Sequence, residues 1–223
     1  EFRRVLFRSL YDETIKQSTR DGVPFPEVLK NNGILTGIKV DTGAMDLALA
    51  PGEKVTEGLD GLRGRLAEYK KLGATFAKWR AVITIGKDIP SDDCINANAH
   101  ALARYAALCQ EAGIVPIVEP EVLMDGDHSI DRCYEVTEFV LKETFQELYY
   151  QKVALEGMIL KPNMAISGKK AKDRANVQQV AEKTVKLLKE CVPSAVPGIA
   201  FLSGGQSDEE ATAHLDAMNK IGG

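Results

Sequence analysis

Lys161 is the first residue whose position suggests chemistry, because it ends a run that otherwise reads as a buried strand, residues 157–163. A strand buried on both faces appears as a short apolar run bounded by turn residues. A lysine there brings an ammonium to the rim of an apolar core, which is costly unless the amine is neutral or paired. Such a lysine can form a Schiff base with a carbonyl. Taken alone, the position more often belongs to a paired structural lysine or a simple phosphate ligand.

Polar residues occur in pairs, two positions apart, near the ends of four strand-like runs. The pairs are Lys39 and Asp41, Lys78 and Arg80, Glu119 and Glu121, and Lys161 and Asn163. Alternate residues of a strand face the same way, so the two members of each pair share a face. Any one pair could be a solvated or structural charge pair. Four pairs in the same relative position predict a charged ring at one mouth of a barrel, where catalytic groups gather.

This predicted ring contains the groups that a Schiff-base enzyme needs. Lys161 is the candidate nucleophile, and the charge of Lys78 disfavours a second ammonium beside it. Glu119 and Glu121 supply carboxylates for proton transfer at the carbinolamine and imine stages. An iminium accepts the electrons released when the carbon–carbon bond two atoms away breaks. The predicted reaction is therefore aldol cleavage.

Two further features indicate a phosphorylated substrate. Residues 203–207, Ser-Gly-Gly-Gln-Ser, follow a strand-like run and precede a helical pattern, so their backbone N–H groups can bind an anion. A Gly-Gly pair before a helix is common, which makes it a weak signal by itself. Lys39 and Arg80 are candidates for the opposite end of the substrate, Arg80 through its bidentate guanidinium.

Strand-like and helical segments alternate along the chain. Strand-like runs cover residues 37–41, 76–83, 114–121, 157–163 and 198–203, and helical patterns cover residues 61–72, 91–112, 129–152, 173–191 and a last segment from Ser207. Ser207 and Glu210 form an S-x-x-E capping box at the start of that segment. Strict alternation predicts parallel βα units and an α/β fold. Glycine-rich strand ends without a nucleotide-binding fingerprint favour a (β/α)8 or TIM barrel over a doubly wound sheet.

The predicted barrel is incomplete. Eight units of about forty residues need on the order of 320 residues, whereas the chain has 223. It supplies about six of the eight strands if residues 10–14 count as one. We therefore expect a partial TIM-barrel domain over residues 10–223, without the first and last strands. Residues 1–9 carry three arginines and do not fit the repeat, so we interpret them as a cloning or assembly scar, with a native strand as the alternative.

Composition narrows the class of protein. With 44% hydrophobic and 27% charged residues, the chain is typical of a soluble globular protein. A net charge of −4 argues against general nucleic-acid binding, and no apolar run approaches the roughly 18 residues of a membrane helix. The four cysteines lack C-x-x-C spacing, so we expect free buried thiols. The three histidines share no metal-ligand spacing, and we predict no metal site.

Taken together, the motifs resemble those of class I fructose-bisphosphate aldolases. The segments that carry the resemblance are residues 10–14 (LYDET), 37–41 (GIKVD), 77–80 (AKWR), 118–121 (VEPE), 160–164 (LKPNM) and 202–206 (LSGGQ). The resemblance implies reversible cleavage of fructose 1,6-bisphosphate to dihydroxyacetone phosphate and glyceraldehyde 3-phosphate, in glycolysis and gluconeogenesis and without a cofactor. It also implies a cytoplasmic protein, with an organellar precursor left open, and a homotetramer for the full-length chain.

The resemblance assigns roles to matching positions. Lys161 matches the Schiff-base lysine, Glu119 the general acid and base, Glu121 its partner, and Lys78 a lysine that assists carbinolamine formation. The positions implied for substrate binding are Lys39, Asp41, Arg80, Ser203 and Gly204. The family also uses a first-strand aspartate, a last-strand Gly-Arg pair and a C-terminal tyrosine that this sequence does not contain. We therefore expect little activity from residues 1–223 alone.

Two alternatives stay open. The first is another Schiff-base lyase on a TIM barrel, such as a transaldolase-like enzyme, which would suit a single phosphate site. The second is a non-catalytic binding or scaffold protein that kept the barrel. Lys39 and Arg80 opposite Ser203 suggest two anionic ends, which favours a bisphosphate as the substrate.

Overall fold

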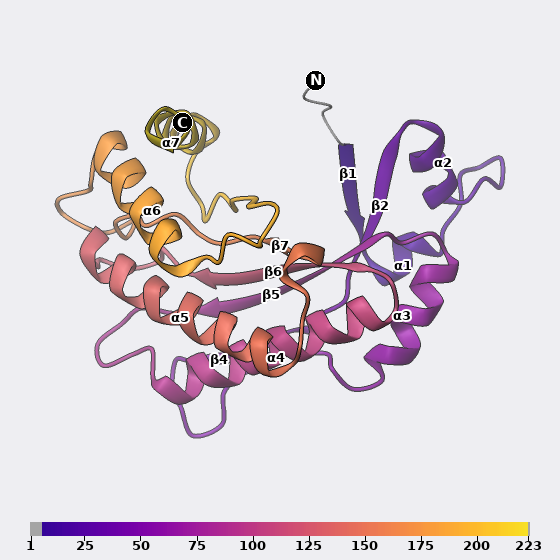
Figure 1. The fold of residues 1–223 in the computed structure, drawn as a ribbon, viewed down its shortest axis with the longest axis horizontal. Coiled ribbons are helices and arrows are strands. Elements are labelled where there is room, and N and C mark those ends of the chain that lie inside the picture. Colours follow the sequence, from indigo (N-terminus) through magenta and orange to yellow (C-terminus); the bar gives the residue numbers. More distant parts are fainter. Residues whose placement is uncertain (1–5, 223) are drawn as a thin grey trace.

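A five-stranded parallel sheet forms the centre of the computed structural model, which describes residues 6–222 (Figure 1). Its strands, in spatial order, are β1 (Leu6–Leu10), β2 (Ile34–Lys39), β5 (Phe76–Ile83), β6 (Val115–Val122) and β7 (Ile159–Leu160). A parallel bridge between Leu160 and Ile199 adds one more connection beyond β7. Strands that follow one another in the sheet also follow one another in the chain, which is the order of a barrel wall. The predicted parallel α/β fold is confirmed.

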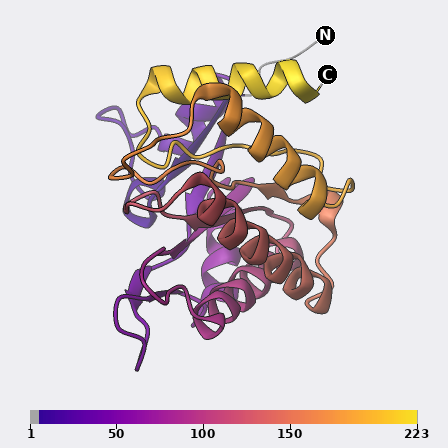
Figure 2. The same cartoon turned by 90° about the vertical axis from the view of Figure 1, so that its left-hand side faces the viewer.

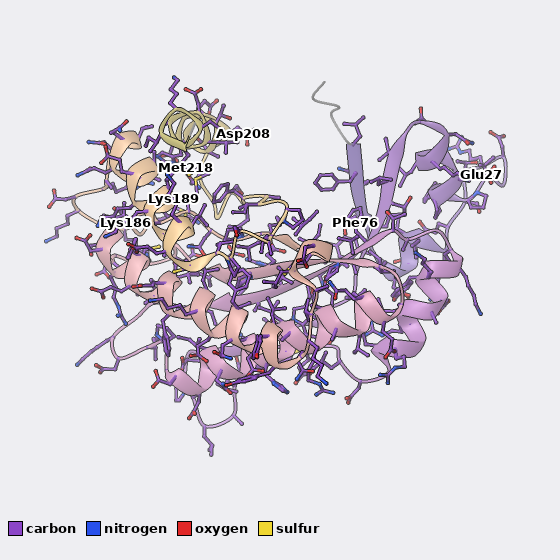
Figure 3. All side chains as sticks on the ribbon, in the orientation of Figure 1. Glu27, Phe76, Lys186, Lys189, Asp208 and Met218 are labelled. Carbon is purple, nitrogen blue, oxygen red and sulfur yellow. The ribbon has the colours of Figure 1, made fainter. Side chains whose placement is uncertain are left out.

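Helices follow the strands and cover one side of the sheet. The long helices are α3 (Leu62–Lys71), α4 (Asp92–Glu111), α5 (Ile130–Tyr150), α6 (Val177–Cys191) and α7 (Asp208–Gly222). Helix α4 packs on β5 and β6, and each of α5, α6 and α7 contacts the helix before it. Figure 2 shows α7, α6, α5 and α4 as successive layers. Met218, labelled in Figure 3, lies where α7 meets α6, in a buried cluster with Val180.

The two faces of the sheet differ because strand residues alternate. Ile38, Ala77, Trp79, Val118 and Leu160 face the helices and are fully buried in the main core. Residues of opposite parity face the other side, and on β5 and β6 these are charged toward the carboxyl ends of the strands. Burial of the helix-facing side chains therefore fixes the register of the strands. A slip by one residue would move the charged residues into the core.

Four helices and two strands lie close to their predicted limits. Helices α3 to α6 begin and end within four residues of the predicted segments, β5 coincides with residues 76–83, and β6 is shifted by one residue. The capping box is confirmed, since the Glu210 N–H donates to the Ser207 hydroxyl at 3.1 Å and the Ser207 N–H to the Glu210 carboxylate at 3.2 Å. Ser91 and Ser129 likewise cap α4 and α5.

The first strand differs from the prediction. Residues 10–14 were expected to be a strand, but the strand is Leu6–Leu10, and Asp12–Ile15 forms the short helix α1. Two acidic residues in the first turn favour a helix start, and Asp12 pairs with Lys16 at 2.8 Å, one turn later. Residues 6–9, interpreted as part of a scar, pair with β2. The origin of residues 1–9 stays a prediction, and residues 1–5 lie outside the described part of the chain.

Strands near Lys161 are shorter than expected. Of the predicted strand at 157–163 only Ile159–Leu160 is regular, and residues 198–203 contribute only the bridge at Ile199. Pro162 has no N–H to donate, which ends the ladder. Backbone bonds nevertheless continue: the Lys161 N–H donates to Val118 O at 2.8 Å and the Leu202 N–H to Pro162 O at 3.3 Å.

Further elements were not predicted. They are helix α2 (Phe25–Asn31), the 3-10 turn Leu155–Gly157, and the antiparallel hairpin of β3 (Gly43–Asp46) and β4 (Lys54–Glu57). None of the helices within residues 6–222 combines the length and apolarity needed to span a membrane.

Tyr105 of α4 connects the helix layer to the two central strands. Its hydroxyl lies 2.7 Å from Ala77 O on β5 and 3.1 Å from Ile117 O on β6, and its ring stacks on Trp79 at 5.5 Å between centroids. The side chain is fully buried. Burial raises the pKa of Tyr105 well above its ordinary value, so the hydroxyl stays a donor. This contact holds together the strands that carry Lys78 and Glu119.

Replacing Tyr105 by phenylalanine is expected to lower the free energy of unfolding by about 1–2 kcal/mol, because the two carbonyls lose a buried donor. Urea unfolding followed by the fluorescence of Trp79, the one tryptophan of the chain, measures this directly. The matched control is Tyr149→Phe, since that side chain is 76% exposed. Equal stability of Y105F and the unchanged protein would contradict the account.

Candidate active site

The charged residues gather around the carboxylate of Glu119. Lys161 Nζ lies 3.0 Å from Glu119 Oε1, and Lys78 Nζ lies 3.2 Å from Oε2. The Glu119 side chain is only 4% exposed, whereas that of Lys161 is 31% exposed. A buried carboxylate is costly unless it is paired, and here two amines from neighbouring strands pair with it. The Lys161 amine keeps access to the outside.

Asp41 extends this arrangement to β2. Its carboxylate lies 2.6 Å from Lys39 Nζ and 4.0 Å from Lys78 Nζ, and it accepts the backbone N–H of Arg80 at 3.4 Å. Positive and negative groups thus alternate in a line across the strand ends, in the order Lys39, Asp41, Lys78, Glu119, Lys161. The register places Lys39 beside Lys78, and without the intervening carboxylates these amines would repel each other.

Arg80 and Glu121 form a separate pair at the rim. The Arg80 guanidinium donates to the Glu121 carboxylate, which is buried. This hydrogen bond raises the pKa of Arg80 above its ordinary value, more than burial lowers it. Arg80 lies opposite Glu119 in the ladder, but its long side chain reaches two positions further along β6 to Glu121. Glu121 is therefore neutralised by Arg80, whereas Glu119 is neutralised by the lysines.

Two cavities adjoin at this mouth of the sheet. One, of about 480 Å³, is lined by Arg80, Glu119, Glu121, Leu123, Asp125, Lys161, Lys169, Phe201, Leu202, Ser203, Gly204 and Gly205. The other, of about 320 Å³, is lined by Ser9, Leu10, Tyr11, Lys39, Asp41, Gly43, Ala44, Lys78, Arg80 and Val82. Arg80 belongs to both walls. The sequence-predicted residues therefore divide into a Lys161 side and a Lys39 side, joined at Arg80.

Asn163 does not join the ring, in contrast to the prediction from its spacing. Its Oδ1 accepts the Val122 N–H at 3.0 Å, and its Nδ2 donates to Thr137 Oγ1 at 3.0 Å and Met164 O at 3.1 Å. The alternation of faces fails because the strand ends before Pro162. Asn163 instead fastens the end of β6, one residue past Glu121, to the segment that carries Lys161.

The glycine loop, residues 203–205, closes the Lys161 side. Gly204 and Gly205 have φ angles of 62° and 88°, which only glycine adopts without strain. Behind the loop, Gln206 Nε2 donates to Ser203 O at 2.8 Å, and Gln206 Oε1 lies 2.6 Å from His214 Nδ1 on α7. Sequence reasoning included Gln206 only through the backbone of residues 203–207, and it gave its side chain and His214 no role in this site. The sequence signal for Gln206 was its position as a polar residue directly after the two glycines.

The sequence predicted neither a metal site nor paired cysteines, and the structure places the side chains concerned. Within residues 6–222, no three His, Cys, Asp or Glu side chains lie close enough together to hold a metal ion. The four cysteines are buried free thiols, as predicted. Burial raises the pKa of Cys94 to about 11, which leaves it a thiol at neutral pH. The site described above presents amines, carboxylates, one guanidinium and backbone N–H groups.

Comparisons with known proteins agree with one another. The family model described as "Glycolytic: Fructose-bisphosphate aldolase class-I" matches residues 7–223. A "Probable fructose-bisphosphate aldolase class 1" of Xanthomonas campestris pv. campestris is 65% identical over 96% of this chain and 64% of its own length. "Fructose-bisphosphate aldolase 5, cytosolic" of Arabidopsis thaliana is 55% identical over 95% of this chain and 59% of its own length.

A solved structure gives the same result. Fructose-bisphosphate aldolase from Plasmodium falciparum, in complex with TRAP and a small molecule inhibitor, matches with a TM-score of 0.95 and 46% identity. The match covers 97% of this chain and 63% of that one. It confirms the predicted parallel α/β fold, with which a partial (β/α)8 barrel is consistent. The chain spans 59–64% of the length of these three relatives.

Two histidines, His128 and His214, are buried. Burial lowers the pKa of His214, with Arg174 acting in the same direction and Glu210 against it. Burial also lowers the pKa of His128, whose two ring nitrogens have no hydrogen-bond partner among the described residues. The folded state therefore favours neutral imidazoles, whereas in the unfolded chain they titrate near pH 6.5. The resulting stability is present above about pH 6.5 and is lost as pH falls below it.

The variant His214→Gln is expected to lose less stability than the unchanged protein when pH falls from about 7 to about 5, because it has no buried imidazole to protonate. Glutamine can still hydrogen-bond to Gln206, which limits the direct structural effect. Urea unfolding at the two pH values gives the difference. An identical loss of stability in both proteins would rule out a contribution from His214.

Proposed function

Because the chain belongs to the class I fructose-bisphosphate aldolase family, as its motifs predicted, we propose that the protein to which it belongs cleaves fructose 1,6-bisphosphate through a Schiff base on Lys161. The products are dihydroxyacetone phosphate and glyceraldehyde 3-phosphate, and the reaction is reversible. One observation carries the proposal: the Lys161 amine lies 3.0 Å from a buried carboxylate and faces the cavity that contains the glycine loop. The proposal concerns the whole protein, since relatives are longer than this chain.

The proposed chemistry begins when Lys161 gives one proton to the Glu119 carboxylate, 3.0 Å away, and the neutral amine attacks the C2 carbonyl. Glu119 donates a proton to the carbinolamine oxygen, which leaves as water, and an iminium forms. The C3–C4 bond then breaks as the C4 hydroxyl loses its proton to the carboxylate, and the electron pair moves into the iminium to give an enamine. Protonation of the enamine at C3 and hydrolysis release dihydroxyacetone phosphate and restore the amine.

The neighbouring groups have supporting roles in this proposal. Lys78 shares the Glu119 carboxylate with Lys161 and keeps it in place when Lys161 becomes covalently bound. Glu121 keeps the Arg80 guanidinium at the boundary of the two cavities. Lys39, held by Asp41, and Arg80 would bind the phosphate at C6, while Ser203 and Gly204 would bind the phosphate at C1. Two separate cationic sides favour a bisphosphate over the single phosphate of a transaldolase-like enzyme.

Other features of the whole protein are proposed on the same basis. A cytoplasmic location is supported by relatives named as cytosolic or cytoplasmic isozymes. A homotetramer follows only from the family resemblance and stays a prediction. A non-catalytic binding role is the second candidate, because the Plasmodium falciparum relative was solved in complex with TRAP. The ion pairs around Lys161 favour the catalytic proposal, since binding alone does not need an accessible amine beside a buried carboxylate.

Borohydride reduction in the presence of dihydroxyacetone phosphate is expected to add one reduced substrate to Lys161. Trapping requires a single condensation and not turnover, so it suits this chain, from which we expect little turnover. The variant Lys161→Arg should abolish the adduct, because a guanidinium keeps its charge and cannot attack a carbonyl. Intact mass and peptide mapping measure both results. An adduct on another lysine, or unchanged trapping in K161R, would refute the assignment.

A further inference from the structure

Lys169 is a cation in the wall of the Lys161 cavity for which the proposed reaction has no role. It follows Lys161 by eight positions, and its backbone N–H donates to Met124 O at 2.8 Å. Its Nζ lies 3.0 Å from Asp125 Oδ1. Lys169 and Asp125 belong to different loops, after β7 and after β6, and both line the cavity of about 480 Å³. The backbone is thus fixed, while the side chain reaches toward the space that a substrate would occupy.

The Lys169 side chain lies directly against the glycine loop. A Cβ atom built on Gly205 would lie 2.7 Å from Lys169 Cε and closer still to Nζ. With glycine at this position, the amine can lie against the backbone of the loop; a side chain here would have to push it aside. Among the described residues, none accepts a hydrogen bond from the backbone N–H of Gly204 or Gly205. The amine and the two glycines therefore lie side by side in the wall of one cavity.

The pairing of Lys169 with Asp125 is easily exchanged. The Lys169 side chain is 43% exposed and that of Asp125 is 62% exposed, and ion pairs between exposed groups contribute little. A phosphate dianion carries twice the charge of the carboxylate and more acceptor oxygens, and it can also accept the N–H groups of Gly204 and Gly205. Phosphate should therefore displace Asp125 from Lys169.

We propose that Lys169 is a phosphate-binding residue, which leaves Asp125 and, together with the backbone of Gly204 and Gly205, binds the phosphate next to the Schiff-base carbon. The identity of the substrate rests on the proposed function, but phosphate binding at this place does not. In dihydroxyacetone phosphate the phosphate-bearing carbon adjoins the carbonyl carbon, so its phosphate site must share a cavity with Lys161, as the glycine loop and Lys169 do.

Titration with inorganic phosphate, followed by phosphorus NMR or calorimetry, tests the proposal without any catalytic step. Lys169→Met should raise the dissociation constant about tenfold or more, because a charged hydrogen bond is lost. Lys170→Met is the matched control: Lys170 is the next residue, is exposed and lies outside the cavity wall. It should change the constant less than about twofold, since an exposed charge outside the site is screened by salt. Lys169→Arg should retain most of the affinity.

The variant Asp125→Asn distinguishes this proposal from a general effect of surface charge. It removes the carboxylate that competes with phosphate for Lys169, so phosphate should bind more tightly in D125N. Equal weakening in K169M and K170M, no phosphate binding in the unchanged protein, or unchanged or weaker binding in D125N would each overturn the proposal. Circular dichroism of each variant checks that the fold is kept.

The outcomes also separate this proposal from the proposed function. If K169M weakens phosphate binding but no Schiff base forms on Lys161, the phosphate site stands and the proposed reaction fails. If Lys161 is trapped by dihydroxyacetone phosphate at the same half-saturating concentration in K169M and the unchanged protein, the reaction stands and the role of Lys169 fails.

Discussion

The structure around the site depends on one buried carboxylate that two amines share. Glu119 is almost completely removed from solvent and lies within ion-pair distance of both Lys78 and Lys161. Losing either amine would leave a buried charge half paired, and losing the carboxylate would bring two ammonium groups together. The three residues lie on three adjacent strands, so this interaction requires the carboxyl ends of β5, β6 and the β7 segment to stay in one register.

Side chains on the helix-covered face of the sheet hold these strand ends in register. Tyr105 links β5 to β6 from the helix layer, and Asn163 links the end of β6 to the Lys161 segment. Gln206 and His214 hold the glycine loop to α7. On the open side, Lys169 is anchored through its backbone and rests on Gly205. The contacts that hold the strand ends thus lie on the face covered by helices, and the amines of Lys161 and Lys169 face the cavity.

Sequence patterns could predict the parts that depend on local signals. Helices α4 and α5 begin at serine caps, and β5 and β6 are long apolar runs whose alternation places Lys78, Arg80, Glu119 and Glu121 on one face. The prediction for Asn163 failed because alternation does not survive the proline that precedes it. Strand Leu6–Leu10 was misplaced because the arginines of residues 1–9 led us to interpret most of it as a scar, with a native strand only as the alternative. The contact of Lys169 with Gly205 joins distant loops, which no local pattern reveals.

The most direct test of the shared carboxylate is a double-mutant cycle between Lys78 and Glu119, with the rate of adduct formation between Lys161 and dihydroxyacetone phosphate as the readout. The rates of the unchanged protein, K78M, E119Q and the double variant give the coupling free energy. If one carboxylate organises both amines, the double variant should be slower by much less than the product of the two single effects, with a coupling of about 1 kcal/mol or more. Single effects that simply multiply would contradict the account.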